Sequence, residues 1–98
     1  MSSGDPQEPR YAKTVQLFSA LANPLRIAIV HCLLEKPHTV SELHECLDIS
    51  QPLASHHLRI LLQAHVISKH PEGRKTYYSL EDEHIVHVVR DIHEHTKE

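Results

Sequence analysis

Two helix-start signals that lie close together constrain the fold of this chain more than any other feature of its sequence. Thr39 and Glu42 have the spacing of a capping box, in which each side chain accepts a hydrogen bond from the other residue's backbone N–H. Ser50 is a second capping residue, and a proline suited to a first helical turn follows it closely. The pattern predicts a short helix over 40–47, a tight turn and a second helix over 51–64, which together make a helix-turn-helix. The leucines of the second helix are expected to supply its buried side: Leu53, Leu58, Leu61 and Leu62.

A β-hairpin is predicted directly after the helix-turn-helix. Residues 66–70 have strand character, residues 71–74 combine Pro, Glu, Gly and Arg in turn chemistry, and residues 75–79 return as a second strand. Ser79 is then expected to cap a last helix, whose acidic first turn suits the positive end of the helix dipole. Because the hairpin has basic residues at its tip, the pattern indicates a winged helix-turn-helix.

Two further helices are predicted before the helix-turn-helix. Asn23 is a capping residue for the second of them, which Pro37 ends. In the first, helical periodicity begins near Tyr11 and places several apolar residues on one face: Val15, Phe18, Leu21 and Ala22. We expect residues 1–9 to form a disordered arm and residues 10–98 to form a single domain. The predicted fold is mainly α-helical with a β-hairpin wing: four helices, two strands and a last helix, in that order.

Charge is distributed unevenly along the chain. The formal net charge is −3, which by itself argues against a nucleic-acid partner. However, residues 56–75 contain four Lys or Arg side chains and one acid, whereas residues 81–98 contain six acids and two bases. The basic stretch coincides with the second helix of the helix-turn-helix and with the wing, so we expect these elements to bind double-stranded DNA.

Position within the helix-turn-helix assigns the expected DNA contacts. The N-terminal residues of the second helix are expected along base edges in the major groove: Gln51, Ser55, His56 and Arg59. Hydroxyl side chains at the two helix starts suit phosphates, which orient a protein without reading sequence: Thr39, Ser41 and Ser50. The basic residues of the wing suit the minor groove or the DNA backbone: Arg74 and Lys75.

Composition argues against several other classes of protein. No apolar run approaches the roughly 18 residues that cross a bilayer, and the polar N-terminal segment does not match a secretory signal. Cys32 and Cys46 form no C-x-x-C pair, so we expect a reduced, cytoplasmic protein in which each cysteine is a small buried side chain. With only two glycines the chain offers no phosphate-binding loop, and it offers no nucleophile–base pair. An enzyme and an organic cofactor are therefore not expected.

Four segments occur together in a combination that is specific: 21–27 (LANPLRI), 39–43 (TVSEL), 50–58 (SQPLASHHL) and 73–80 (GRKTYYSL). In this combination the chain resembles the ArsR/SmtB family of bacterial repressors, over about residues 11–98. The resemblance implies a homodimer whose interface is formed by the first and last helices. It also implies that a metal ion is often the inducer, and that the regulated genes serve metal efflux or sequestration.

The last helix carries the candidate metal ligands. The resemblance to the zinc-sensing branch implies D-x-H near its start and H-x-x-H or H-x-x-E near its end, which match Asp82, His84, His95 and Glu98. His84 and His95 differ by about 20° around a helix but are about 16 Å apart along its axis, so one zinc ion cannot bridge them within one chain. An antiparallel partner helix removes this difficulty and gives two equivalent interfacial zinc sites per dimer.

Zinc is the metal that this donor set favours. The family's thiolate site is absent because Thr39 and Ser41 occupy its positions, which disfavours arsenic, antimony and cadmium. Cobalt can substitute for zinc, whereas the family's nickel sensors recruit additional histidines. His87 and His93 match no ligand position and are interpreted as surface residues. The backbone near His65 is expected to accept a hydrogen bond from a ligating histidine and so to couple metal and DNA binding.

The sequence thus predicts a zinc-responsive repressor whose metal-free dimer binds operator DNA, but it leaves alternatives open. A winged-helix repressor can instead respond to oxidation, with Cys32 and Cys46 as sensors, or to an organic ligand. A metal-buffering or adaptor dimer would not bind DNA at all. The acidic last helix can also be an ordinary amphipathic helix with these residues inward: Ile85, Val88, Val89 and Ile92.

Overall fold

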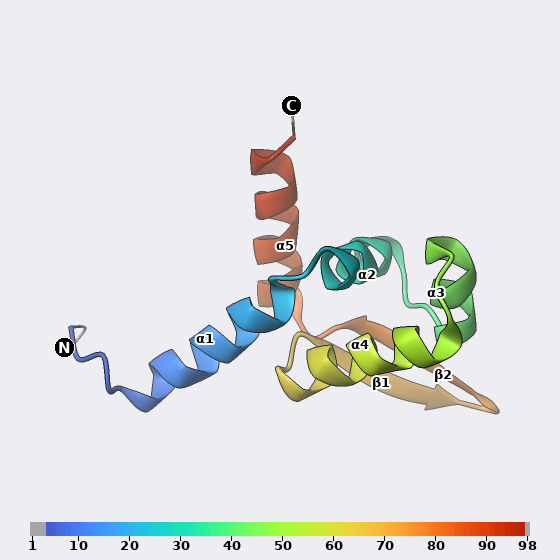
Figure 1. The fold of residues 1–98 in the computed structure, drawn as a ribbon, viewed down its shortest axis with the longest axis horizontal. Helices are drawn as coiled ribbons and strands as arrows, with labels where there is room; N and C mark the ends of the chain where they lie inside the picture. Colours follow the sequence, from blue (N-terminus) through green and yellow to red (C-terminus); the bar gives the residue numbers. More distant parts are fainter. Residues whose placement is uncertain (1–3, 98) are drawn as a thin grey trace.

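The computed structural model describes residues 4–97, and over that range the elements follow one another in the predicted order (Figure 1). The strands β1 (Ile67–Glu72) and β2 (Lys75–Leu80) form an antiparallel hairpin, and α5 (Glu83–His95) follows it. The helices that precede the hairpin are α1 (Pro9–Leu21), α2 (Pro24–Glu35), α3 (Val40–Leu47) and α4 (Gln51–Gln63). The winged helix-turn-helix predicted from the sequence is confirmed.

The wing extends toward one end of the molecule, and α1 and α5 extend in other directions (Figure 1). The hairpin runs alongside α4 and its tip points away from α1, while α1 and α5 both project from the rest of the molecule (Figure 1). No single helix of residues 4–97 is long and apolar enough to cross a membrane. The helices α1 and α2 meet the requirement when they are taken together, but the chain bends by 92° between them.

Side-chain caps hold the helix-turn-helix at the predicted boundaries. Thr39 Oγ1 accepts the N–H of Glu42 at 3.1 Å, and Glu42 Oε1 accepts the N–H of Thr39 at 2.9 Å, which completes the capping box. Ser50 Oγ accepts the N–H of Leu53 at 3.2 Å at the start of α4. Between the two helices Asp48 has a left-handed backbone (φ 54°), which ends α3 and which a short polar side chain tolerates.

The wing is a hairpin with a two-residue loop, and the pairing of its two strands places the residues at the base of the hairpin in the core. Gly73 is the first loop residue and has φ 65°, a left-handed conformation that glycine adopts without steric cost. Ile67 and Leu80 pair at the base of the hairpin, and both are buried. The predicted cap at Ser79 is wrong, because β2 continues through Leu80 to place that side chain in the core. Asp82 caps α5 instead, and its Oδ1 accepts a backbone N–H of the first helical turn at 3.0 Å.

An aliphatic core joins the helix-turn-helix to α2 and to the base of the wing. Leu53 is an exception to the predicted pattern, since it is 40% exposed at the start of α4. The fully buried large side chains are Ile29, Val30, Leu43, Leu58, Leu61, Val66 and Ile67. They come from α2, α3, α4 and the start of the hairpin, so the position of α4 depends on all of these elements.

Two leucines of α4 provide a matched test of this core. Leu58 is 1% exposed whereas Leu53 is 40% exposed. We expect Leu58→Ala to lower the free energy of unfolding by about 2–5 kcal/mol through lost burial and a cavity. Leu53→Ala should change it by only about 0.5 kcal/mol. Urea denaturation at one fixed protein concentration measures both, and equal losses would contradict the assigned packing of α4.

Candidate nucleic-acid interface and metal ligands

The exposed side of α4 carries the residues predicted to face base edges. Gln51, His56 and Arg59 are exposed and Ser55 is half-buried. The opposite side of the helix packs into the core through Leu58 and its buried neighbours. The predicted base-reading residues are therefore available on a helix that the core holds in place.

A groove between the start of α3 and the wing brings four of the other predicted DNA contacts together. Its volume is about 400 Å³, and its lining residues are Thr39, Val40, Ser41, Glu42, Arg74, Lys75 and Thr76. Sequence reasoning placed Thr39 and Ser41 on one element and Arg74 and Lys75 on another, and the fold makes them neighbours. Thr76 was missed, since its position in a strand gives no signal until the hairpin is placed beside α3.

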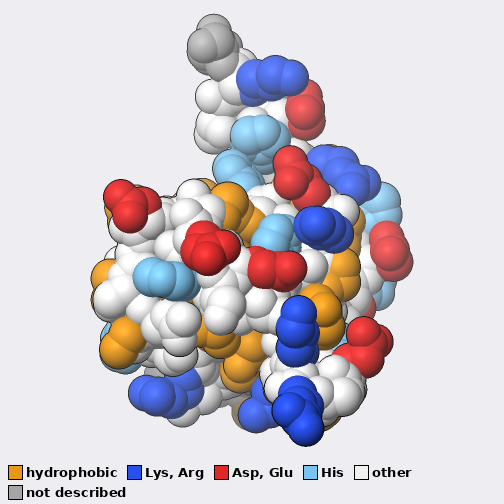
Figure 2. Space-filling model, turned by 90° about the vertical axis from the view of Figure 1, so that its right-hand side faces the viewer, with side chains coloured by type: hydrophobic (Ala, Val, Ile, Leu, Met, Phe, Trp, Pro, Cys, Tyr) orange, Lys and Arg blue, Asp and Glu red, His pale blue; other side chains and the backbone are white. Residues whose placement is uncertain are grey.

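Glu42 is an acid inside this otherwise basic groove, and its carboxylate is committed to the capping box. The N–H of Thr39 is the main cause that holds the pKa of Glu42 below its ordinary value, and nearby His38, Lys36 and Lys75 act in the same direction. Figure 2 shows several Lys and Arg side chains at the lower end of this face, while others lie higher up among the Asp and Glu side chains. The negative net charge of the chain is thus compatible with a basic surface at this end.

A contact that the sequence did not reveal fixes α4 to the first two helices. Arg26 Nη1 donates to His57 Nδ1 at 3.0 Å, and Arg26 Nε donates to the carbonyl oxygen of Ala20 at 2.6 Å. Because a guanidinium only donates, His57 Nδ1 must be an unprotonated acceptor. Burial lowers the pKa of His57 from 6.5, and the charges of Arg26 and His56 lower it further. One arginine therefore connects α1, α2 and the helix predicted to read DNA.

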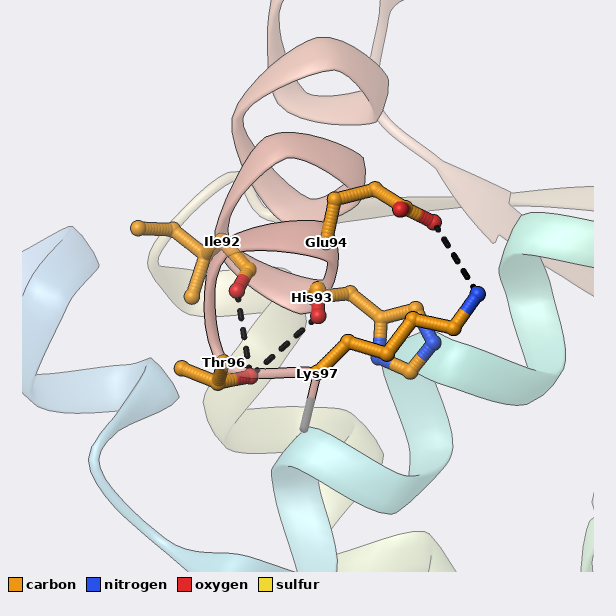
Figure 3. Close-up of polar contacts among 5 residues, drawn as sticks. All are labelled: Ile92, His93, Glu94, Thr96 and Lys97. Carbon is orange, nitrogen blue, oxygen red and sulfur yellow. Dashed lines mark hydrogen bonds and ion pairs between the residues drawn. The ribbon is translucent and has the colours of Figure 1, made fainter.

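The candidate metal ligands lie at the two ends of one continuous helix. Asp82 caps α5, His84 follows in its first turn, and His95 is its last residue. His84 and His95 are exposed, and neither side chain makes a hydrogen bond or ion pair within residues 4–97. The C-terminal turn is closed by the hydroxyl of Thr96, which donates to the carbonyl oxygens of Ile92 and His93 at 3.2 Å each (Figure 3). Glu98 lies outside the described residues.

Within residues 4–97 of one chain, no group of three or more His, Cys, Asp or Glu side chains is placed to hold a metal ion. His87 is exposed, as predicted. His93 is exposed too, but its ring also meets that of His31 on α2 edge-to-face, with the centroids 4.3 Å apart. Burial lowers the pKa of His31, and the neighbouring His93 lowers it further.

Apolar side chains are left exposed on α1 and α5. Phe18 and Ile92 are 59% and 57% exposed, and Val15 and Val88 are exposed as well. Phe18, Val88 and Ile92 also line a largely apolar groove of about 390 Å³ between α1, α2 and α5. Val15 and Phe18 of the predicted apolar face of α1 are therefore not covered within one chain, whereas Leu21 packs against the core and Ala22 lies just after the helix. On α5, Ile85 and Val89 pack inward as in an ordinary amphipathic helix, but Val88 and Ile92 do not.

The two cysteines lie next to each other. Cys32 on α2 and Cys46 on α3 have their Sγ atoms 3.8 Å apart, and both are free thiols. Cys32 is half-buried, but Cys46 is exposed, so the prediction of a buried side chain is wrong for Cys46. Its position near the end of the short helix α3 leaves it on the side that faces α2 and solvent.

Fold and site together define a winged helix-turn-helix protein with a basic wing and an incompletely covered pair of helices, α1 and α5. A family model described as bacterial regulatory protein, arsR family, matches residues 23–69. The chain is 45% identical over 83 residues to the HTH-type transcriptional repressor SmtB of Mycobacterium tuberculosis, covering 85% of this chain and 62% of that protein. It is 39% identical over 74 residues to the arsenical resistance operon repressor of Bacillus subtilis, covering 74% of this chain and 70% of that protein. Among solved structures, HlyU of Vibrio cholerae matches with a TM-score of 0.83 and 29% identity, covering 91% of this chain and 97% of HlyU.

The chain belongs to the arsR family of bacterial regulatory proteins. It spans 62% of the length of the mycobacterial SmtB, just under two thirds. The two relatives named above are described as repressors, in agreement with the expectation that the chain is not an enzyme.

The contact between Arg26 and His57 predicts a pH dependence of stability. The pKa of His57 is lowered from 6.5 in the folded chain, so below about pH 6.5 the unfolded chain binds more protons and the folded state loses stability. His57→Gln keeps an acceptor for Arg26 but does not titrate. We expect the unfolding free energy of this variant to fall less between pH 7 and pH 5 than that of the unmodified chain.

Exposed His87 gives the control for this measurement. His87→Gln should leave the slope of unfolding free energy against pH unchanged. Some slope should persist in His57→Gln, because the pKa of His31 is also lowered. Identical slopes for His57→Gln and the unmodified chain would contradict the assigned role of His57.

Proposed function

We propose that this protein is a cytoplasmic, zinc-responsive transcriptional repressor that acts as a homodimer. In this proposal the metal-free dimer binds operator DNA, and zinc bound between the two α5 helices releases it. Membership of the arsR family supports a regulator, and two relatives are named as repressors, one of them of an arsenical resistance operon. The proposal depends most on one observation, the arrangement of His84, Val88, Ile92 and His95 along α5.

These four residues form one stripe on the helix surface. At 100° per residue they fall within about 80° of one another around the axis, with a histidine at each end and the two exposed apolar side chains between. A second copy of α5, packed antiparallel on Val88 and Ile92, would bury this apolar centre. It would also place His84 of one chain beside the partner subunit's His95, and the twofold axis would repeat the pairing at the other end.

The exposed side chains of α1 support the same arrangement. Val15 and Phe18 lie on the helix that borders the apolar groove next to α5, and they are as exposed as Ile92. A chain of 98 residues buries a limited share of its surface, so leaving four large apolar side chains in water costs stability that association recovers. We therefore assign the dimer interface to α1 and α5.

The donor atoms at the ends of this stripe suit zinc. His84 and His95 offer uncommitted imidazoles, and Asp82 has one carboxylate oxygen left after its Oδ1 caps α5. Glu98, outside the described residues, is the fourth proposed ligand. Two nitrogen and two oxygen donors match tetrahedral zinc, and cobalt or nickel are the competing ions. When bound, zinc would supply a fixed link between the two α5 helices.

DNA binding is assigned to the surface at the other end of the molecule. Gln51, Ser55, His56 and Arg59 on α4 would meet base edges in the major groove. Thr39, Ser41 and Ser50 would bind phosphates, and Arg74 and Lys75 would reach the DNA backbone or minor groove from the wing. The groove shared by α3 and the wing supports this assignment, because one phosphate-bearing strand can contact both elements there.

The two ends must be coupled if zinc is to release DNA. Coupling of this kind typically amounts to about 1–3 kcal/mol and is reciprocal, so DNA would weaken zinc binding by the same factor. A ligating histidine has a second ring nitrogen free to donate a hydrogen bond. We propose the backbone near His65, in the turn that joins α4 to β1, as its acceptor.

Removing one proposed ligand tests the metal site. In a zinc titration of the operator-bound protein, His84→Ala and His95→Ala should each raise the zinc concentration needed for DNA release by more than about 100-fold. Loss of a ligand should cost more than the roughly 10–100-fold that loss of an outer hydrogen-bond partner costs. Fluorescence anisotropy of labelled operator measures the release.

His87→Ala is the matched control, because His87 is an exposed histidine on the same helix but off the stripe. It should release DNA at the same zinc concentration as the unmodified protein. If His84→Ala and His95→Ala also do so, the proposed zinc site is wrong, whereas unaltered DNA binding without zinc shows that the variants are folded.

Two substitutions separate sequence reading from phosphate contact. Gln51→Ala should cost about 1–3 kcal/mol on the operator and little on unrelated DNA. Arg74→Ala should weaken binding to both and reduce the salt dependence by about one phosphate contact. Affinities measured at several salt concentrations test this, and if both variants bind both DNAs as tightly as the unmodified chain, the proposed DNA-binding surface is wrong.

A further inference from the structure

The proposed function leaves the two cysteines unused, although they are adjacent. Cys32 and Cys46 come from different helices, α2 and α3, which pack against each other. Their Sγ atoms are 3.8 Å apart, which is van der Waals or weak hydrogen-bond contact between two thiols. A disulfide has an S–S distance of about 2.05 Å, so the sulfurs need to approach by only about 1.8 Å.

The two thiols differ in access. Cys46 is exposed near the C-terminal end of α3, whereas Cys32 is half-buried on α2. Burial first, and then the hydrogen bond to Cys46 and the charges of Cys46 and Glu35, together raise the pKa of Cys32 to about 11. Because the thiolate is the reactive form of cysteine, Cys32 is a poor first nucleophile, whereas Cys46 is open to reagents from solvent.

We propose that Cys32 and Cys46 form a reversible dithiol–disulfide pair within one chain, in which Cys46 reacts first with a peroxide and Cys32 resolves the product. The Cys46 thiolate attacks one oxygen of hydrogen peroxide. An S–O bond forms, the O–O bond breaks, and hydroxide leaves and becomes water by taking up a proton. Cys46 is thereby oxidised by two electrons to a sulfenic acid.

Cys32 then completes the reaction. It loses its proton and attacks the sulfur of the Cys46 sulfenic acid, so the S–S bond forms, the S–O bond breaks and a second water leaves. In balance, two thiols and one hydrogen peroxide give one disulfide and two waters. A small dithiol such as dithiothreitol reverses the change by thiol–disulfide exchange. The disulfide would tie the end of α3 to α2.

Peptide mapping of the full chain tests the pair. The reduced protein, freed of metal with a chelator, is treated with one equivalent of hydrogen peroxide and digested with a protease that cleaves after glutamate. Glu35, Glu42 and Glu45 lie between the cysteines, so the two thiols fall on separate peptides. We expect a linked Cys32–Cys46 peptide pair, a chain that migrates as a monomer under non-reducing denaturing conditions, and full reversal by dithiothreitol.

Single variants assign the two roles. In Cys32→Ser the sulfenic acid on Cys46 should persist and be trapped by dimedone. In Cys46→Ser the remaining thiol, Cys32, should react with hydrogen peroxide at no more than roughly a tenth of the rate of Cys46 in Cys32→Ser. Cys32→Ala repeats the first measurement with an apolar replacement, and circular dichroism shows that each variant is folded.

Three results would overturn the proposal: oxidation of both thiols without a linked peptide pair, disulfides between chains as the main product, or equal reactivity of Cys32 and Cys46. Neither zinc nor DNA enters the experiment. Its outcome is therefore independent of the proposed function.

Discussion

Two backbone hydrogen bonds between His38 and Tyr78 hold the candidate DNA-binding surface together. The N–H of His38 donates to the carbonyl oxygen of Tyr78 at 3.0 Å, and the N–H of Tyr78 donates to that of His38 at 2.8 Å. They attach β2 to the residues immediately before α3, so the wing and the start of α3 share one frame. Both residues are largely removed from water, and leaving such buried backbone groups unpaired would be costly. The groove that collects hydroxyl and basic side chains exists because of this attachment.

The starts of the helices could be predicted because their causes are local. Thr39, Ser50 and Asn23 each bond to N–H groups within three residues, so a short stretch of sequence contains the whole interaction. The start of α5 was misplaced because its cause is distant. Whether the chain is still a strand at Ser79 depends on the pairing of the next residue, Leu80, with Ile67 and on the space left for it in the core.

Contacts that depend on how distant elements pack could not be predicted from the sequence either. Leu53 is a different case, because at 100° per residue it lies about 140° around α4 from buried Leu58, so helical spacing alone already separates the two positions. The contact between Arg26 and His57 joins residues 31 positions apart, and the contact between the two thiols depends on how α2 and α3 cross. By contrast, the expectation that His84 and His95 share one face follows from helix geometry alone, because both lie in the continuous helix α5.

The two-residue loop of the wing limits how proteins built on this fold can diversify. Side chains on a strand alternate between faces, so inserting one residue within β1 or β2 would reverse the faces of the strand residues on one side of the insertion. Either the pairing of Ile67 with Leu80 would slip and expose the core, or a bulge would have to absorb the extra residue. New DNA preferences in the wing are therefore more accessible by exchanging side chains at its tip than by changing its length. The length of the wing is thus constrained by strand pairing, whereas the side chains at its tip can vary.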